Sequence, residues 1–351
     1  MARNAWDPRR LPDLTGRRYL VTGSTRGLGY FATEQLVRAG AHVILTGRNP
    51  NRLAAAHAAI ERRVLGASRL PGEGTAAEPS AQDAGEPGHG VAETRHRPTG
   101  SVETLLLDTS NFGSIRAAAA TARTRGPLHG LLLNAGIVHA PRQRQTAGGH
   151  ELVFATNVLG HFSLAGELLQ NLAVVGGRMV WLGSMSTVMG DYEPVDPELV
   201  HDYSPWRAYV QSKVATTVLG IEADRRLRAA GVPVASLVAH PGYAISGRTP
   251  GVRGVNEPSR LTRFVDNLQT PIAQSKEHGA YTLVRALVDA EVEGGQLWGP
   301  RFVLHGTPHR AKPARLVRDP ELGARLWEYC ENATRVRWPF EKAARARRRL
   351  R

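Results

Sequence analysis

Short apolar runs alternate with longer segments of helical periodicity along most of the chain. Apolar runs of roughly four to eight residues that end at a turn residue are typical of buried strands, and apolar positions that recur every three to four residues are typical of helices. Residues 17–23 and 41–47 are runs of the first kind, and 27–40 and 49–66 are segments of the second kind. Strand, helix, strand, helix predicts βαβ units and a parallel sheet.

The same alternation resumes after residue 100. We expect strands at 102–108, 128–136, 177–184 and 232–242, and helices at 110–126, 148–172 and 204–231. Further helices are expected around 260–269 and 275–290, and a last strand has room within 294–306. No linker divides the chain, so the pattern predicts a single doubly wound α/β domain, with a parallel sheet and flanking helices.

Three segments stand apart from this pattern. Residues 66–100 are rich in Gly, Pro, Ala and Glu and show no hydrophobic period, so we expect a disordered insertion there. Residues 1–14 are interpreted as an N-terminal extension, 15–330 as the domain itself, and 331–351 as a basic tail.

Charge and cysteine content narrow the function classes. The net charge is +14, but residues 335–351 hold eight basic residues and one acid, and no nucleic-acid-binding motif accompanies them. A solvated basic tail therefore explains the charge better than specific nucleic-acid binding. The single cysteine, Cys330, excludes an internal disulfide and a thiolate metal cluster. No apolar run reaches the roughly 20 residues of a membrane span, and no secretory signal is evident, so we expect a cytoplasmic protein.

The stretch "TGSTRGLG" at 22–29 lies between the first strand and the first helix, and it carries Gly23, Gly27 and Gly29. Glycines at such a turn let the backbone approach a phosphate at the positive end of a helix dipole. NAD sites often have an acid at the end of the second strand. This chain has Arg48 there and Arg26 in the loop. Because arginine grips a 2′-phosphate, NADP(H) is favoured over NAD(H), although both arginines also suit a plain surface.

The stretch "YVQSK" places Tyr209 and Lys213 four residues apart, on one face of a helix. Tyrosine has a pKa of about 10, which is too high for an efficient base at neutral pH. A cation one turn away favours the phenolate, so we expect Lys213 to lower the pKa of Tyr209. Only four of the 45 basic residues are lysines, which makes a lysine at this position informative.

These motifs, together with "NAG" at 134–136, Asn157, Ser184, "TNVLGHF" and "HPG" at 240–242, resemble the short-chain dehydrogenase/reductase family. The resemblance covers about residues 15–330 without the insertion, and it is nearest to the retinol-dehydrogenase-like branch. The family implies a Rossmann-type fold. The arginine- and alanine-rich composition suggests a bacterial source.

The resemblance also implies catalytic roles. Tyr209 would be the general acid/base, Lys213 would lower its pKa and bind the nicotinamide ribose, and Ser184, rather than the nearby Ser186, would hold the substrate oxygen. Asn157 would bend its helix and anchor a proton-relaying water. Implied cofactor-binding residues comprise Gly23, Ser24, Thr25, Arg26, Gly27, Leu28, Gly29, Arg48, Asp108, Thr109, Asn134, Ala135, Gly136, Tyr209, Lys213, Pro241, Gly242 and Ser246.

The resulting hypothesis is an NADP(H)-dependent oxidoreductase acting on a small-molecule alcohol or carbonyl substrate. The alternatives are a non-catalytic NADP-binding scaffold or an epimerase or dehydratase on the same fold. Residues 243–267 would form a substrate lid, whose arginines face either a polar substrate or solvent. Many family members pair through the helices that carry Asn157 and Tyr209, so we expect a homodimer.

Overall fold

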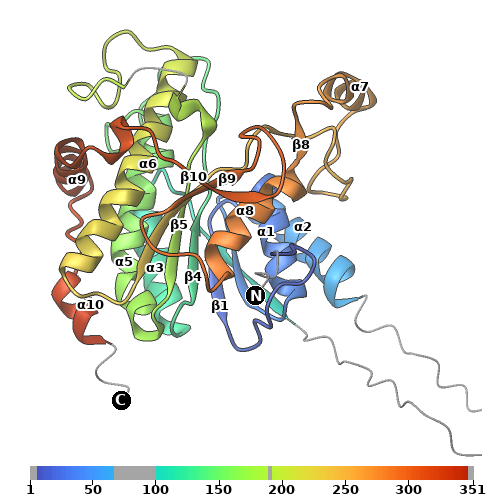
Figure 1. Cartoon of the computed structure of the whole chain (residues 1–351), viewed down its shortest axis with the longest axis horizontal. Helices are drawn as coiled ribbons and strands as arrows, with labels where there is room; N and C mark the ends of the chain where they lie inside the picture. Colours follow the sequence, from blue (N-terminus) through green and yellow to red (C-terminus); the bar gives the residue numbers. More distant parts are fainter. Residues whose placement is uncertain (1–5, 67–99, 189–191, 347–351) are drawn as a thin grey trace, which may run out of the picture.

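The computed structural model describes residues 6–66, 100–188 and 192–346. Its centre is an eight-stranded sheet with helices on both faces (Figure 1). The strands, in their order across the sheet, are β10 (Pro308–Ala311), β9 (Leu297–Pro300), β6 (Ala235–Ala239), β5 (Arg178–Leu182), β4 (Gly130–Leu133), β1 (Arg18–Val21), β2 (His42–Gly47) and β3 (Ser101–Leu106). All neighbours pair in parallel except β10 with β9. The predicted doubly wound α/β fold is confirmed.

Two layers of helices enclose the sheet (Figure 1). One layer holds α1 (Gly27–Arg38), α2 (Pro50–Ile60) and α8 (Lys276–Val288), and the other holds α3 (Phe112–Thr124), α5 (Gly160–Val175) and α6 (Pro205–Ala229). All four residues of β4 are buried. Because both faces of the sheet are covered, its central strands read as continuous apolar runs rather than as alternating ones.

The direction of strand addition reverses next to β1. The chain moves outward from β1 to β2 and β3, and then returns to β4 on the other side of β1. The loops that leave neighbouring strands at such a reversal diverge and open a crevice at their carboxyl ends. The glycine-rich loop after β1 and the "NAG" segment after β4 therefore meet at this point.

Side-chain caps set several helix starts. Asn49, at the start of the helical segment predicted at 49–66, accepts a hydrogen bond at Oδ1 from Arg52 N at 3.0 Å, and Pro50 occupies the first helical position. Ser204 caps α6 in the same way through Arg207 N at 3.2 Å. These local interactions satisfy backbone donors that a helix start leaves unpaired, and they explain why the start of α2 was predictable.

The helix expected at 148–172 is continuous but irregular. It consists of α4 (Leu152–Phe154), a π-helical turn (Ala155–Leu159) and α5. Within the described residues, Leu152–Val175 has the length and mean hydropathy of a membrane span, but 89% of its most apolar window is buried in the core, as in the core helix of a globular protein. The π turn lies at Asn157 and widens the helix at a residue implicated in catalysis.

The interpretation of 331–351 as a basic appendage needs correction. Helix α9 (Pro320–Thr334) runs into this segment, and α10 (Phe340–Ala346) lies within it. Trp338 is 5% exposed. The centre of its ring lies 4.7 Å from the ring centre of Trp327 and 5.4 Å from that of Phe162. The charge count concealed these apolar residues, which pack on α5 where Gly166 leaves room: a Cβ on Gly166 would lie 2.6 Å from Trp338.

Other sequence expectations had different outcomes. The last strand expected within 294–306 is β9, whereas β10 was not anticipated because its sequence, "PHRA", has little apolar content. The expected disordered insertion at 66–100 lies, except for its two end residues, outside the described residues. A short two-stranded sheet pairs β7 (Ala244–Ile245) with β8 (Gln274–Ser275). The segment between these strands contains α7 (Arg260–Leu268), which projects from the body (Figure 1).

Truncating Trp338 should destabilise the whole domain. Removing a buried tryptophan leaves a cavity that costs about 3–5 kcal/mol, so Trp338→Ala should lower the free energy of unfolding by that amount in a chemical denaturation experiment. Arg345→Ala, at an exposed position on α10 shortly after Trp338, is the matched control and should change it by less than about 0.5 kcal/mol. Equal stability of Trp338→Ala and wild type would show that residues 335–346 do form an appendage.

Candidate active site

The glycine-rich loop and the segment after β4 interlock at the strand reversal. Gly23 has φ +65°, and a Cβ on it would lie 2.8 Å from the Cα of Ala135. A Cβ on Gly29 would lie 2.5 Å from Asn134 Nδ2 and 2.6 Å from the carbonyl oxygen of Gly23. Only glycine fits these positions, and the result is a loop whose backbone lies open to the crevice at the start of α1.

The hydroxyl of Thr22 joins the two segments. It accepts the backbone N–H of Asn134 at 2.7 Å and that of Ala135 at 2.9 Å. Asn134 returns the contact, because its Nδ2 donates to the carbonyl oxygen of Thr22 at 2.8 Å. Asn134 and Ala135 thus contact the loop through their backbone N–H groups, and the Asn134 side chain contacts its inner side. The sequence interpretation quoted Thr22 within its motif but gave it no role.

His161 extends this network to the helix that carries Asn157. Its Nε2 lies 3.1 Å from Thr22 Oγ1, and its Nδ1 lies 3.1 Å from the carbonyl oxygen of Asn157. A carbonyl oxygen only accepts, so Nδ1 carries the proton, and Nε2 is left as an acceptor facing the Thr22 hydroxyl, which also donates to Leu132 O at 3.1 Å. Burial, together with nearby Lys213, lowers the pKa of His161 to about 3, so the ring is neutral at ordinary pH. Only its place in "TNVLGHF" hinted at this role.

Asn157 is held rigidly within the π turn. Its Oδ1 accepts from Ile137 N at 2.8 Å, and its Nδ2 donates to Ile137 O at 3.0 Å and to Ser212 Oγ at 2.9 Å. Gly136 lies against the same side chain, since a Cβ there would be 3.1 Å from Asn157 Oδ1. The amide therefore locks the segment after β4 to the catalytic helices, while its backbone carbonyl faces His161 and Thr216.

Ser184 and Tyr209 meet at the end of β5. The Tyr209 hydroxyl donates to Ser184 Oγ at 3.3 Å. Ser186 lies behind them: its hydroxyl and its backbone N–H donate to Ser184 Oγ at 3.0 and 3.1 Å, and it is 2% exposed. The structure thus separates the two serines. Ser184 contacts the tyrosine, and Ser186 orients Ser184.

Lys213 does not act on Tyr209 as expected. Its Nζ donates to the carbonyl oxygen of Leu182 at 2.8 Å and lies 6.0 Å from the centre of the Tyr209 ring. Burial raises the pKa of Tyr209, and only the hydrogen bond between Tyr209 and Ser184 opposes that change. The expected lowering of this pKa by Lys213 is therefore wrong for this structure. Burial also lowers the pKa of Lys213 itself, to about 8.

The start of α1 has the features of a phosphate-binding site. Arg26 occupies the N-cap position, but its side chain does not cap the helix. The free backbone N–H groups and the helix dipole therefore face the crevice. Ser24, in contrast, is fully buried, and its Oγ donates to Val21 O at 3.1 Å and accepts from Thr46 N at 2.8 Å. Ser24 shapes the loop, whereas Thr25, Arg26 and Gly27 form its accessible part.

The other predicted cofactor residues are spread along the same edge. Asp108 uses Oδ1 to accept from Ser110 N and Ser110 Oγ at 2.9 and 2.7 Å, which leaves Oδ2 available. Thr109 is buried, and its carbonyl oxygen lies so close to Gly160 that a Cβ there would collide with it. After β6, Pro241 O accepts from Gln274 Nε2 at 2.6 Å, and a Cβ on Gly242 would lie 2.3 Å from Leu304 O. These residues therefore make structural contacts within the chain as well as lying near the proposed cofactor site.

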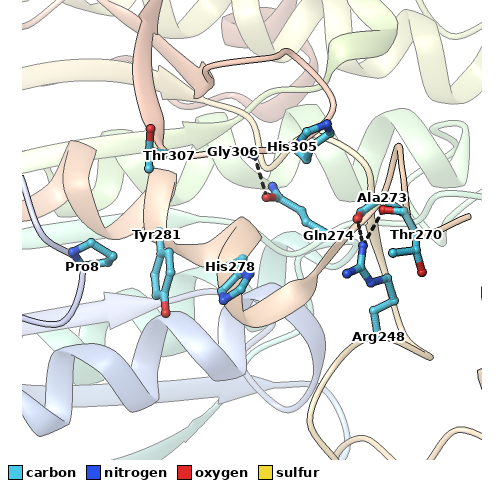
Figure 2. Close-up of a pocket in the computed structure, with 10 residues that line it drawn as sticks. All are labelled: Pro8, Arg248, Thr270, Ala273, Gln274, His278, Tyr281, His305, Gly306 and Thr307. Atoms are coloured by element: carbon cyan, nitrogen blue, oxygen red, sulfur yellow. Dashed lines mark hydrogen bonds between the residues drawn. The ribbon is translucent and has the colours of Figure 1, made fainter. Parts of the chain in front are cut away.

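A cavity of about 410 Å³ lies at the base of the lid (Figure 2). Arg248 donates there to Thr270 O at 2.8 Å and to Ala273 O, and Gly306 N donates to Gln274 Oε1 at 3.2 Å. Tyr209 and Ser184 do not line this cavity. Arg248 therefore connects the beginning of the lid to the residues that follow it. Its guanidinium contacts the backbone of the chain itself, rather than a substrate or solvent.

Helix α7 presents an unexpected apolar face. Leu261, Phe264, Val265 and Leu268 recur at helical spacing and are 71%, 64%, 46% and 71% exposed. Asp266 lies on the other side of the helix and accepts the N–H of Gly247 at 2.6 Å. The lid is thus anchored by its polar side and exposes its apolar side. The prediction for residues 243–267 concerned the arginines of the lid and did not include this apolar face.

Acid should weaken folding through His161. Its pKa is about 6.5 unfolded and about 3 folded, so its contribution is fully present above pH 6.5 and is lost as the pH falls toward 3. The loss is about 1.4 kcal/mol per pH unit in that window. His161→Gln, which keeps a donor and an acceptor, should flatten the slope of unfolding free energy against pH by about one proton.

Two features make this measurement specific. Burial also lowers the pKa of His240, to about 4, so a residual slope should remain in His161→Gln. His201→Gln, at an exposed position, controls for the loss of a histidine as such. Parallel slopes for wild type and His161→Gln between pH 6.5 and 4 would show that His161 is not held neutral by the fold.

Comparisons with known proteins agree with this geometry. The short chain dehydrogenase family model matches residues 17–84 and 67–244. A polyprenol dehydrogenase of Mus musculus is 31% identical over 331 residues, which is 93% of this chain and 86% of that protein. A probable oxidoreductase of Streptomyces lividans is also 31% identical, over 90% of this chain and 97% of that protein.

A solved structure of an uncharacterized protein from Mycobacterium paratuberculosis is 28% identical and covers 95% of this chain and 99% of its own, with a TM-score of 0.71. An L-sorbose reductase of Gluconobacter frateurii, solved with NADPH and L-sorbose, has a TM-score of 0.58 over 85% of this chain and 98% of its own. At 15% identity it supports the fold alone. The family model and the 31% identical relatives show that the chain is an NAD(P)-dependent oxidoreductase of the short-chain dehydrogenase family.

Proposed function

We propose that the protein is an NADP(H)-dependent oxidoreductase that interconverts an apolar alcohol and its carbonyl compound, with Tyr209 as the proton donor or acceptor. The observation that carries the proposal is the pairing of Tyr209 with Ser184 at 3.3 Å, beside a phosphate-binding loop and with Lys213 one helical turn away. A scaffold needs no such pair. An epimerase or dehydratase would share it, but no feature of the described residues favours those reactions over simple hydride transfer.

The chain's own groups suit carbonyl reduction. Tyr209 keeps its proton at neutral pH and can donate it to a carbonyl oxygen, and burial, which raises its pKa, favours this protonated form over the phenolate that alcohol oxidation needs. Ser184 lies within reach of the same oxygen, and Ser186 fixes its orientation. When bound, the nicotinamide cofactor supplies or accepts the hydride. Lys213, one helical turn from Tyr209 and largely charged below pH 8, would bind the nicotinamide ribose rather than set the pKa of Tyr209.

Two arginines support NADP(H). Arg48 directly follows β2, and Arg26 lies at the tip of the glycine-rich loop; both are exposed. Neither forms an ion pair with a carboxylate of the described chain. The last residue of β2 is Gly47, so no acid stands where a 2′-hydroxyl would be bound. Two free guanidinium groups beside that position favour a 2′-phosphate.

The lid favours an apolar substrate. Four apolar side chains of α7 face away from the lid's anchor, and Trp206, 52% exposed, packs on the ring of Tyr209 at 6.1 Å. Exposed apolar side chains on α7, and Trp206 next to Tyr209, suit a ligand that buries hydrocarbon. The name of the mouse relative, polyprenol dehydrogenase, points to a long-chain alcohol for that protein. Substrate length is accordingly the first variable to explore.

The proposal does not include a homodimer through the helices that carry Asn157 and Tyr209. In this chain α9 packs on α6, and α10 packs on α5. Trp327 and Trp338 bury their rings there against Phe162. The surfaces expected to pair two copies are thus covered by the chain's own C-terminal helices.

NADPH oxidation with aldehydes and ketones of increasing chain length tests the function. The kcat/KM value should rise with chain length, because each buried CH₂ contributes about 0.8 kcal/mol. Tyr209→Phe should lower kcat roughly 100- to 10,000-fold, since it removes the proton donor and keeps the ring, while NADPH affinity stays within about threefold. Tyr203→Phe is the matched control at a tyrosine outside the pair. Full activity of Tyr209→Phe would contradict the mechanism.

Cofactor choice is tested by fluorescence titration with NADPH and NADH. Wild type should bind NADPH at least about tenfold more tightly, because a charge-assisted bidentate contact is worth about 1.5–3 kcal/mol. Arg48→Ala should remove most of that preference and leave NADH affinity unchanged. Arg52→Ala, an exposed arginine in the next helix, serves as the control. Tighter binding of NADH than NADPH by wild type would refute the assignment.

A further inference from the structure

The side chain of Lys276 lies across the glycine-rich loop. Lys276 is the first residue of α8, and its Cδ is 3.7 Å from the position of a Cβ on Gly27. Its Nζ donates to Ser246 Oγ at 2.6 Å. The lysine therefore joins two segments assigned to the cofactor, the loop before α1 and the segment after β6. Lys276 was not among the residues that the sequence predicted to bind the cofactor.

The backbone that carries Lys276 is fixed relative to α1. Lys276 N donates to Thr249 Oγ1 at 2.9 Å, and Gln35 of α1 donates from Nε2 to Glu277 O at 3.1 Å. The first turn of α8 also lies close to the loop, since a Cβ on Gly279 would be 2.9 Å from Leu28 Cδ2. These contacts leave the lysine side chain directed along the loop rather than into solvent.

Positive charge accumulates at this point. Lys276 is half-buried, and its only side-chain hydrogen bond within the described residues goes to the neutral Ser246 hydroxyl. Burial lowers the pKa of Lys276, nearby Arg26 lowers it further, and Asp266 raises it. The uncapped start of α1 adds a partial positive charge. Two cations and a helix N-terminus that share one place repel each other, and an anion between them would relieve the repulsion.

We propose that Lys276 binds the diphosphate of the nicotinamide cofactor, an inference that rests on the proposed function. The diphosphate of a dinucleotide lies at the start of the helix that follows the glycine-rich loop, and the Lys276 side chain reaches that place. An ammonium group has three donors, so one can stay on Ser246 Oγ while the others meet phosphate oxygens. NADPH and NADH share the diphosphate, so Lys276 contributes to the affinity of both, unlike Arg48.

Binding measurements on Lys276→Gln test this role. NADPH, NADH and ADP should each bind roughly ten- to a hundredfold more weakly than to wild type, as for the loss of a charge-assisted hydrogen bond. Adenosine, followed by displacement, should bind equally to both proteins because it lacks phosphate. Lys276→Arg keeps the charge and should recover part of the loss. Lys312→Gln, at an exposed position, should bind all four ligands as wild type does.

Each other outcome has a distinct meaning. Unchanged affinity of Lys276→Gln for ADP would overturn the inference, and so would a loss confined to NADPH, which would place the lysine at the 2′-phosphate. An equal loss for adenosine would also overturn it, because the change would then act through the shape of the site. If wild type itself bound neither NADPH nor NADH, the proposed function would fail first.

Discussion

The buried hydroxyl of Thr22 is the contact on which the site depends. It accepts two backbone N–H groups from the segment after β4, donates to Leu132 O and lies within hydrogen-bond distance of His161 Nε2. One oxygen thereby fixes the glycine-rich loop, the neighbouring segment and the catalytic helix relative to one another. Asn157 makes the second connection, between the segment after β4 and the Tyr209 helix. Without these two groups, the parts that must meet a cofactor and a substrate would be connected only through their strands.

Burial, rather than charge pairing, sets the protonation states in this site. It raises the pKa of Tyr209 and lowers those of Lys213 and His161. Each group therefore prefers its neutral form more than it would in water. For Tyr209 this keeps the proton on the oxygen, and for His161 it keeps the single tautomer that the Thr22 contact needs.

Local signals in the sequence were sufficient for the fold and for the chemistry-bearing motifs. Continuous apolar runs predicted the central parallel strands, and helical periodicity from residue 49 predicted α2. What the sequence could not show were contacts between distant segments. The packing of Trp338 in a groove opened by Gly166 joins residues that no local period relates, and the strand "PHRA" pairs only because β9 presents an edge to it. The direction of the Tyr209 pKa depends on burial, which spacing does not encode.

The choice of lysine at two positions follows from the same reasoning. Lys213 and Lys276 are two of four lysines among 45 basic residues, and both lie within the site, whereas Lys312 and Lys342 are exposed. Lys213 reaches a backbone carbonyl at the end of β5, and Lys276 passes over a glycine. Both places are narrow, and a thin stem with a compact charge fits where a planar guanidinium would need more width. Arginine occurs instead at positions 26 and 48. Both side chains are exposed and have room for a wide, bidentate contact. The distribution of the two cations thus follows the space available at each position.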